Sequence, residues 1–227
     1  MNLSNFFAAL AALAAAALGL AHATALAQSS AVPAVPAAPP PQAAAAPAAD
    51  EGAASPPRAP RTPRYLLRAP NGRAVTSETF NGRVQLVTFG FTSCADVCPT
   101  TLLELQQVLR ALGPRAAQVQ AIFISVDPER DTPEVLAAYT RAFDPRIVGL
   151  GGSEALVRRA AESFGVVYRK VPSPGAAANA YTVDHSTGLF VLDADGVWMG
   201  KIGFGTPVAD IVRRVEDFIE EAFPLPR

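Results

Sequence analysis

The stretch that most constrains the fold is an apolar strand that leads directly into two cysteines. Residues 84–91 are rich in β-branched and aromatic side chains, which predicts a buried strand. Cys94 and Cys98, the only two cysteines of the chain, follow it. A helix comes next, because Pro99 suits a first helical turn and leucines recur at helical spacing from residue 102 to residue 112. We therefore expect both thiols between a strand and a helix, beside amide N–H groups that favour a thiolate.

The Cys-x-x-x-Cys spacing leaves three kinds of chemistry open. If the second half of the loop is helical, Cys94 and Cys98 share one face with Cα atoms about 6 Å apart. A disulfide can bridge that distance, and the two sulfurs can equally bind one metal ion. The motif is therefore a redox dithiol, a structural disulfide or half of a metal site.

The first 27 residues predict export. An apolar run from Phe6 to Ala21 precedes the triplet Ala-Leu-Ala at 25–27, which suits signal-peptide cleavage before Gln28. The run is short and alanine-rich for a membrane span, although the first seven residues lack the usual Lys or Arg. We favour a cleaved signal peptide over a retained anchor. Either form places the rest of the chain in the periplasm, soluble or tethered to the inner membrane, where a Cys94–Cys98 disulfide can form.

Residues 28–63 are a low-complexity stretch of Ala and Pro with almost no large apolar side chains. Such a stretch cannot bury enough surface to fold, so we expect an extended, disordered linker. Residues 64–226 have the length of one domain with a full core. The formal net charge of −1 indicates no nucleic-acid partner.

The remaining elements predict an α/β fold. A short hairpin is expected around Asn71-Gly72, and a second buried strand at 119–126 ends at the acidic loop 127–133. Thr132 and Pro133 are good N-cap and first-turn residues, so we interpret this loop as turn and cap chemistry. Further strands are expected at 147–150, 166–171, 188–193 and 197–202, and further helices at 133–143, 153–164 and from 206 onward. This order predicts a mixed sheet flanked by helices, with parallel strands inside and an antiparallel hairpin at one side.

The same order places a third candidate residue at the cysteine loop. A strand antiparallel to residues 84–91 begins at the edge where the cysteine loop leaves the sheet, and the strand at 188–193 is preceded by His185. His185 is also the only histidine left once His22 is removed with the signal peptide. We therefore expect His185 to meet Cys94 and Cys98.

Two thiolates and one imidazole suit a soft metal. A structural zinc site usually has four protein ligands, and no other cysteine or suitable histidine exists. A blue-copper site needs two histidines, and the Cys-x-x-Cys-His motif of c-type haem is absent. Thiolates select Cu(I), so copper, one ion per chain as Cu(I) or Cu(II), is the best-fitting metal.

Three motifs in this order resemble the Sco/SenC family. They are GFTSCADVCPT at 90–100, DPERDTP at 127–133 and VDHS at 183–186. The resemblance implies a thioredoxin-like fold and a copper site made by Cys94, Cys98 and His185. It also implies a role in assembling the dinuclear copper centre of cytochrome c oxidase, with the oxidase's copper-binding subunit and other copper chaperones as partners. Family members often have Pro after the first cysteine, where this chain has Ala95.

Three functions remain open. A copper chaperone needs His185, whereas a thiol–disulfide reductase acting on the oxidase subunit needs only Cys94 and Cys98 as its reactive pair. A non-catalytic domain with a structural disulfide is the third. Air-isolated protein should contain the Cys94–Cys98 disulfide and bind copper weakly, because both sulfurs are then consumed.

Overall fold

The structure is a computed structural model and describes residues 61–172 and 180–223. The predicted signal peptide at 1–27 and nearly all of the linker at 28–63 lie outside these residues. None of the helices in the described part of the chain has the length and apolar character that a bilayer crossing needs.

The centre of the fold is a five-stranded mixed sheet in the order β5-β4-β3-β8-β9. Strands β3 (Val84–Gly90), β4 (Val119–Ser125) and β5 (Ile147–Leu150) are parallel, and β8 (Leu189–Leu192) and β9 (Trp198–Ile202) run antiparallel at one side. Every residue of β3 and β4 is buried, as expected for parallel strands covered on both faces. The predicted α/β class and mixed sheet are confirmed.

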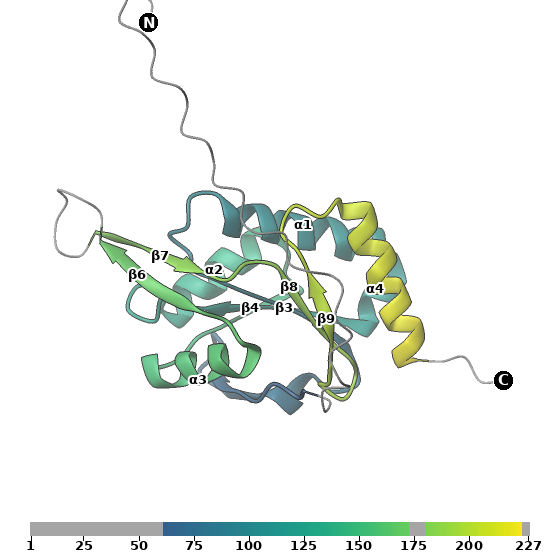
Figure 1. Cartoon of the computed structure of the whole chain (residues 1–227), viewed down its shortest axis with the longest axis horizontal. Coiled ribbons are helices and arrows are strands. Elements are labelled where there is room, and N and C mark those ends of the chain that lie inside the picture. Colours follow the sequence, from purple (N-terminus) through teal and green to yellow (C-terminus); the bar gives the residue numbers. More distant parts are fainter. Residues whose placement is uncertain (1–60, 173–179, 224–227) are drawn as a thin grey trace, which may run out of the picture. The chain divides into compact units, whose positions relative to one another are not determined.

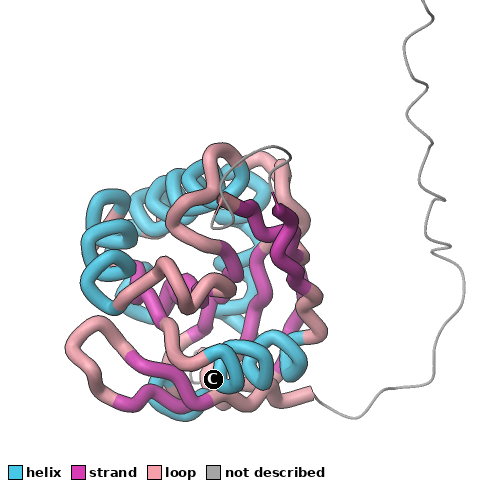
Figure 2. The backbone as a smooth tube through the Cα atoms, turned by 90° about the vertical axis from the view of Figure 1, so that its left-hand side faces the viewer, coloured by secondary structure: helices cyan, strands magenta, loops and turns pink. Residues whose placement is uncertain are grey.

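Helices cover both faces of this sheet. The helices α1 (Val97–Ala111), α2 (Pro133–Phe143) and α4 (Val208–Ala222) lie on one face (Figure 1). The other face is covered by α3 (Glu154–Phe164) and by a hairpin of β1 (Leu66–Arg68) and β2 (Ala74–Thr76). Figure 2, turned by 90°, shows helices on both sides of the strands. Two short 3₁₀ helices, Ser77–Phe80 and Gly113–Gln118, complete the elements that the structure describes.

Local signals in the sequence position these elements. The Thr132 hydroxyl oxygen accepts a hydrogen bond from the Val135 N–H at 3.3 Å and caps α2. Gly165 ends α3 with a φ of 70°, a left-handed conformation that favours glycine. In the β8–β9 turn, the Asp193 carboxylate accepts from the N–H groups of Asp195 and Val197. The capping and turn residues therefore act as predicted at these positions, whereas Ser153 precedes α3 without a side-chain cap bond.

The described chain begins at the end of the sheet away from the cysteines. The Trp198 N–H, at the start of β9, donates to the Arg61 carbonyl at 2.8 Å. The Arg61 guanidinium also lies 5.8 Å from the centre of the Trp198 indole. Because β9 is parallel to β3, its start is at the amino end of β3, and Cys94 follows the carboxyl end.

One element was missed in the sequence. Residues 181–185 form a strand, β7 (Tyr181–His185), which pairs with β6 (Tyr168–Pro172) in a separate two-stranded ribbon. Neither strand belongs to the central sheet. The ribbon matters because His185 is its last residue.

Candidate metal centre

The cysteine loop joins the carboxyl end of β3 to the start of α1. Cys94 lies in the loop and is half-buried, whereas Cys98 is the second residue of α1 and is only 3 % exposed. Both cysteines are free thiols in this structure. The helix begins at Val97, so the motif is divided between loop and helix instead of lying on one helical face.

Gly90 gives the Cys98 sulfur its place against the sheet. A Cβ atom at Gly90 would lie 2.8 Å from Cys98 Sγ and 2.7 Å from Cε2 of Phe123. Both distances are shorter than ordinary van der Waals contact, which lies near 3.5–4.0 Å for carbon. The last residue of β3 must therefore lack a side chain for Cys98 and Phe123 to pack as they do.

His185 approaches the same sulfur from the ribbon. Its Nε2 atom is 3.6 Å from Cys98 Sγ, and its Nδ1 atom is 3.0 Å from the Ser186 carbonyl oxygen. A carbonyl can only accept, so Nδ1 carries a ring hydrogen, and Nε2 is the ring nitrogen that faces the thiol. Phe91 holds the ring edge-on, with centroids 6.1 Å apart. Of the two cysteines that His185 was predicted to meet, it contacts Cys98, and the antiparallel β3–β8 pairing on which the prediction was based is confirmed.

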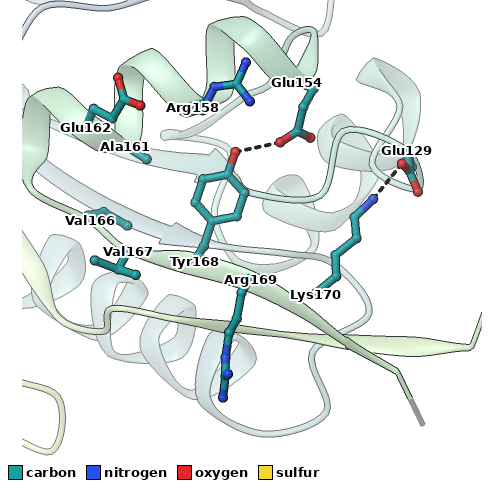
Figure 3. Close-up of a pocket in the computed structure, with 10 residues that line it drawn as sticks. All are labelled: Glu129, Glu154, Arg158, Ala161, Glu162, Val166, Val167, Tyr168, Arg169 and Lys170. Carbon is teal, nitrogen blue, oxygen red and sulfur yellow. Dashed lines mark hydrogen bonds and ion pairs between the residues drawn. The ribbon is translucent and has the colours of Figure 1, made fainter.

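The ribbon that carries His185 is held to the body by side chains of β6 (Figure 3). The Tyr168 hydroxyl donates to Glu154 of α3 at 2.9 Å, and the Lys170 ammonium pairs with Glu129 at 2.6 Å. Tyr168 is the cross-strand partner of His185, so the two side chains share a face of the ribbon. Polar contacts next to His185 thus orient it toward the body of the domain.

The acidic loop fixes the start of the cysteine loop. The Asp131 carboxylate accepts from the Thr92 N–H at 3.1 Å, the Thr92 hydroxyl at 2.6 Å and the Ser125 hydroxyl at 2.5 Å. Asp131 is 4 % exposed, so these three bonds replace the water that a buried carboxylate loses. The residue links the ends of β3 and β4 directly before Cys94.

The same loop also binds the histidine strand. The Arg130 guanidinium donates to the Tyr181 carbonyl at 2.9 Å, pairs with Asp127 and lies 3.9 Å from the centre of the Tyr181 ring. The Tyr181 hydroxyl in turn donates to Asp127 at 2.7 Å, and Asp127 is fully buried. The interpretation of this loop as turn and cap residues is correct for Thr132, but it missed the contacts of Arg130 and Asp127 with Tyr181. The available signal was a cluster of charged residues at the same edge of the sheet as the cysteines.

The two thiols are in different electrostatic environments. Burial, together with the neighbouring Cys94 sulfur, raises the pKa of Cys98 to about 12. Burial also tends to raise the pKa of Cys94. Hydrogen bonds from the N–H groups of the residues that follow, up to Cys98, outweigh this effect, so the pKa of Cys94 lies below its usual value. Cys94 is thus the more easily ionised thiol.

The three candidate ligands reach one edge of the sheet without closing on a common point. Within residues 61–172 and 180–223, no three His, Cys, Asp or Glu side chains are arranged so that they could hold a metal ion. Cys98 and His185 are in contact through Sγ and Nε2, and Cys94 lies in the loop before α1. The groove drawn in Figure 3, between α3 and β6, contains none of the three.

Known proteins with similar sequences are SCO2-like proteins. An SCO2-like protein of Rickettsia prowazekii is 37 % identical over 129 residues, covering 57 % of this chain and 62 % of its own length. The human mitochondrial SCO2 homolog is 40 % identical over 148 residues, covering 63 % of this chain and 55 % of its own. The chain therefore spans less than two thirds of the length of these relatives.

Solved structures give the same result for the fold. The copper-bound structure of ScoI from Bradyrhizobium japonicum superposes with a TM-score of 0.63 at 38 % identity, covering 68 % of this chain and 97 % of that one. The thioredoxin-like fold that the motifs implied is confirmed. Residues 53–220 match the family described as SCO1/SenC. This chain belongs to the SCO1/SenC family.

Proposed function

We propose that this protein binds one copper ion through Cys94, Cys98 and His185 and delivers it during assembly of the dinuclear copper centre of cytochrome c oxidase. The observation that carries the proposal is the contact of Cys98 Sγ with His185 Nε2 at 3.6 Å. The nitrogen that faces the sulfur is Nε2, because Nδ1 is bonded to the Ser186 carbonyl. The Cys98 thiol and the Nε2 atom of the imidazole thus already face each other.

The donor set supports copper as the cargo. Thiolate sulfur selects Cu(I), and imidazole nitrogen is a good ligand for both copper oxidation states. A ligating histidine commonly donates its second ring N–H to a backbone carbonyl, as His185 does to Ser186. The 38 % identical ScoI from Bradyrhizobium japonicum has been solved with copper bound. The two thiols and His185 would hold the ion, and copper supplies no chemistry beyond being carried.

Copper titration of the reduced protein tests this function. We expect one Cu(I) per chain, and loss of most of the affinity in Cys94→Ser and in Cys98→Ser. His185→Ala should weaken Cu(II) binding far more than Cu(I) binding, since Cu(II) prefers nitrogen and oxygen donors. Copper binding that survives both cysteine variants would exclude the proposed site.

A second function, thiol–disulfide reduction of the oxidase subunit's cysteines, is favoured by the asymmetry of the two thiols. A half-buried Cys94 with a lowered pKa suits the attacking thiol, and a buried Cys98 suits the one that resolves the mixed disulfide. Oxidase assembly in cells separates the two functions. Full assembly with His185→Ala, and none with Cys94→Ser, would favour the reductase over the chaperone.

The copper-binding subunit of the oxidase and other copper chaperones remain the proposed partners, since the family resemblance implies them. The proposed location is the periplasm, with residues 1–27 as a cleaved signal peptide or a retained anchor and residues 28–63 as the linker. N-terminal sequencing of the protein from a periplasmic extract tests both parts. A start at Gln28 in the soluble fraction is the expected result, and an intact Met1 in the membrane fraction would establish the anchor.

A further inference from the structure

The ribbon of β6 and β7, which carries His185, is attached to the body chiefly by side chains. It projects at one side of the domain (Figure 1). Within residues 61–172 and 180–223, a single hydrogen bond joins the main chain of these two strands to the body, from the Arg130 guanidinium to the Tyr181 carbonyl at 2.9 Å. A contact between two side chains can rearrange by rotation of either one, whereas a bond to the main chain holds the strand itself. Arg130 therefore fixes the place at which β7 begins.

Arg130 also contacts both halves of the candidate metal centre. Its guanidinium carbon is 3.9 Å from the centre of the Tyr181 ring, on the histidine strand. The same atom is 5.6 Å from the centre of the Phe91 ring, at the start of the cysteine loop, which is within the range of a cation–π contact. Phe91 in turn packs edge-on against the ring of His185. One guanidinium thus supports the strand that carries His185 and the ring that borders it.

The position of Arg130 is itself determined by a closed set of contacts. Its Nε atom pairs with the carboxylate of Asp127, and the Tyr181 hydroxyl donates to that same carboxylate at 2.7 Å. The Nη2 atom is buried and has no partner among the described residues. A buried donor without a partner destabilises a fold, so the pairing with Asp127 alone does not explain why an arginine is used. A guanidinium is suited to this place because it is planar and can bond to two acceptors while it lies against a ring.

We propose that Arg130 is a positioning residue of the copper site, which holds Tyr181 and Phe91 so that Nε2 of His185 stays against the Cys98 sulfur. The inference rests on the proposed function. The cysteines belong to the loop and helix after β3, and His185 belongs to the ribbon. A ribbon that is no longer fixed therefore moves the imidazole and leaves both sulfurs in place. Because Cu(II) depends on nitrogen donors more than Cu(I) does, its binding should suffer more.

The test variant is Arg130→Lys. Lysine keeps a positive charge beside Asp127, but its ammonium cannot bond to the carboxylate and to the Tyr181 carbonyl while lying flat on a ring. The variant thus removes the positioning contacts and keeps the charge.

Arg146→Lys is the matched control. Arg146 pairs with Asp144 through Nε and Nη2, and its Nη1 atom donates to the Leu109 carbonyl at 3.1 Å. It has the same kinds of partner as Arg130, a nearby carboxylate and a distant main-chain carbonyl. It precedes β5, whose start lies at the amino end of the parallel strands, away from the cysteines.

The metal-free and the copper-bound protein give separate measurements. In the reduced, metal-free protein, NMR signals of the His185 ring should lose the ring-current shift caused by Phe91 in Arg130→Lys, and keep it in Arg146→Lys. Cu(II) binding should weaken about tenfold in Arg130→Lys, as is typical when a residue that orients a metal ligand is changed. Nitrogen hyperfine splitting in the electron paramagnetic resonance spectrum of Cu(II) should weaken with it. Cu(I) binding should match wild type, and Arg146→Lys should match wild type in every copper measurement.

A double-mutant cycle separates positioning from a general structural role. If Arg130 acts through His185, then His185→Ala and the double variant with Arg130→Lys should bind Cu(II) with equal affinity. Further weakening in the double variant would overturn the inference, because Arg130 would then act on the cysteines or on the fold as a whole.

The remaining outcomes also decide the matter. Wild-type His185 signals and wild-type Cu(II) affinity in Arg130→Lys would overturn the inference and leave the proposed function intact, and so would equal losses in Arg146→Lys. If Arg130→Lys does not fold, Tyr181→Phe takes its place, since it removes only the hydroxyl that bonds to Asp127. It should weaken Cu(II) binding about threefold, and wild-type affinity there would overturn the inference. A wild-type protein that binds no copper would overturn the proposed function and this inference together.

Discussion

Replacement of Gly90 by alanine should damage the thiol site and the core at once. The added methyl group would lie 2.7 Å from Phe123 Cε2 and 2.8 Å from Cys98 Sγ. Carbon atoms in contact normally stay about 3.5–4.0 Å apart, so the neighbours must retreat by roughly 1 Å. Phe123 is 1 % exposed and Cys98 is 3 % exposed, so both are surrounded by packed core with little room to move.

The expected loss of stability follows from two opposing effects. Overpacking of a filled core costs about 1–3 kcal/mol. Alanine restricts the unfolded chain more than glycine does, which returns about 0.4–1 kcal/mol where the backbone is compatible. We expect Gly90→Ala to lower the free energy of unfolding by about 1–2 kcal/mol. For a chain of this size that is a fall in Tm of about 3–6 °C.

Urea unfolding, thermal unfolding and Cu(I) titration measure the effect. Gly200→Ala is the matched control, because a Cβ at Gly200 of β9 would meet only Phe218 Cζ at 3.9 Å. The control should stay within about 0.5 kcal/mol of wild type and bind Cu(I) normally, whereas Gly90→Ala should bind Cu(I) more weakly because Cys98 Sγ is displaced. Equal stability and equal copper affinity in the two variants would refute the reasoning.

Three further predictions follow from the charged and ionisable groups. Arg130→Gln leaves the fully buried Asp127 without its cation and should lower the free energy of unfolding, measured in urea, by about 3 kcal/mol. A loss of less than about 1 kcal/mol would contradict the role given to this ion pair. Asp144→Asn should lower the free energy of unfolding by about 1 kcal/mol at pH 7. The salt bridge to the arginine two residues on lowers the pKa of Asp144, so its stabilisation exists above the carboxyl's unfolded pKa and disappears as pH falls through the folded one. If the difference in the free energy of unfolding between Asp144→Asn and wild type does not shrink in acid, the predicted pH dependence is wrong. At pH 7.5 iodoacetamide should alkylate Cys94 at least about tenfold faster than Cys98, because Cys94 is more exposed and has the lower pKa. Peptide mapping by mass spectrometry measures which cysteine is alkylated first, and faster alkylation of Cys98 would disprove the prediction.

Elements set by local chemistry could be predicted from the sequence. The helix from Pro133 to Phe143 begins and ends at the predicted residues, because Thr132 and Pro133 are a cap and a first-turn residue that act within one turn. The strands β3 and β4 are equally clear, since a strand buried on both faces shows as a continuous apolar run. His185 could be placed beside Cys98 because chain direction alone determines which strand ends meet.

Interactions between distant segments could not be predicted in this way. The strand β7 alternates polar and apolar residues weakly, and it is a strand only because β6 pairs with it. Arg130 gives no local sign of its contact with Tyr181, which lies 51 residues further along the chain. The same holds for Asp131 and Thr92, which are brought together by the pairing of β3 with β4.

The hydrogen bond from Trp198 to Arg61 distinguishes the two ends of the central sheet. One pole, at the carboxyl end of β3, carries Cys94, Cys98 and His185, and the other receives the incoming chain beside the first residue of β9. Arg61 is therefore separated from the thiols by the length of the sheet. The fold thus places the first described residue and the candidate metal centre at opposite ends of one sheet.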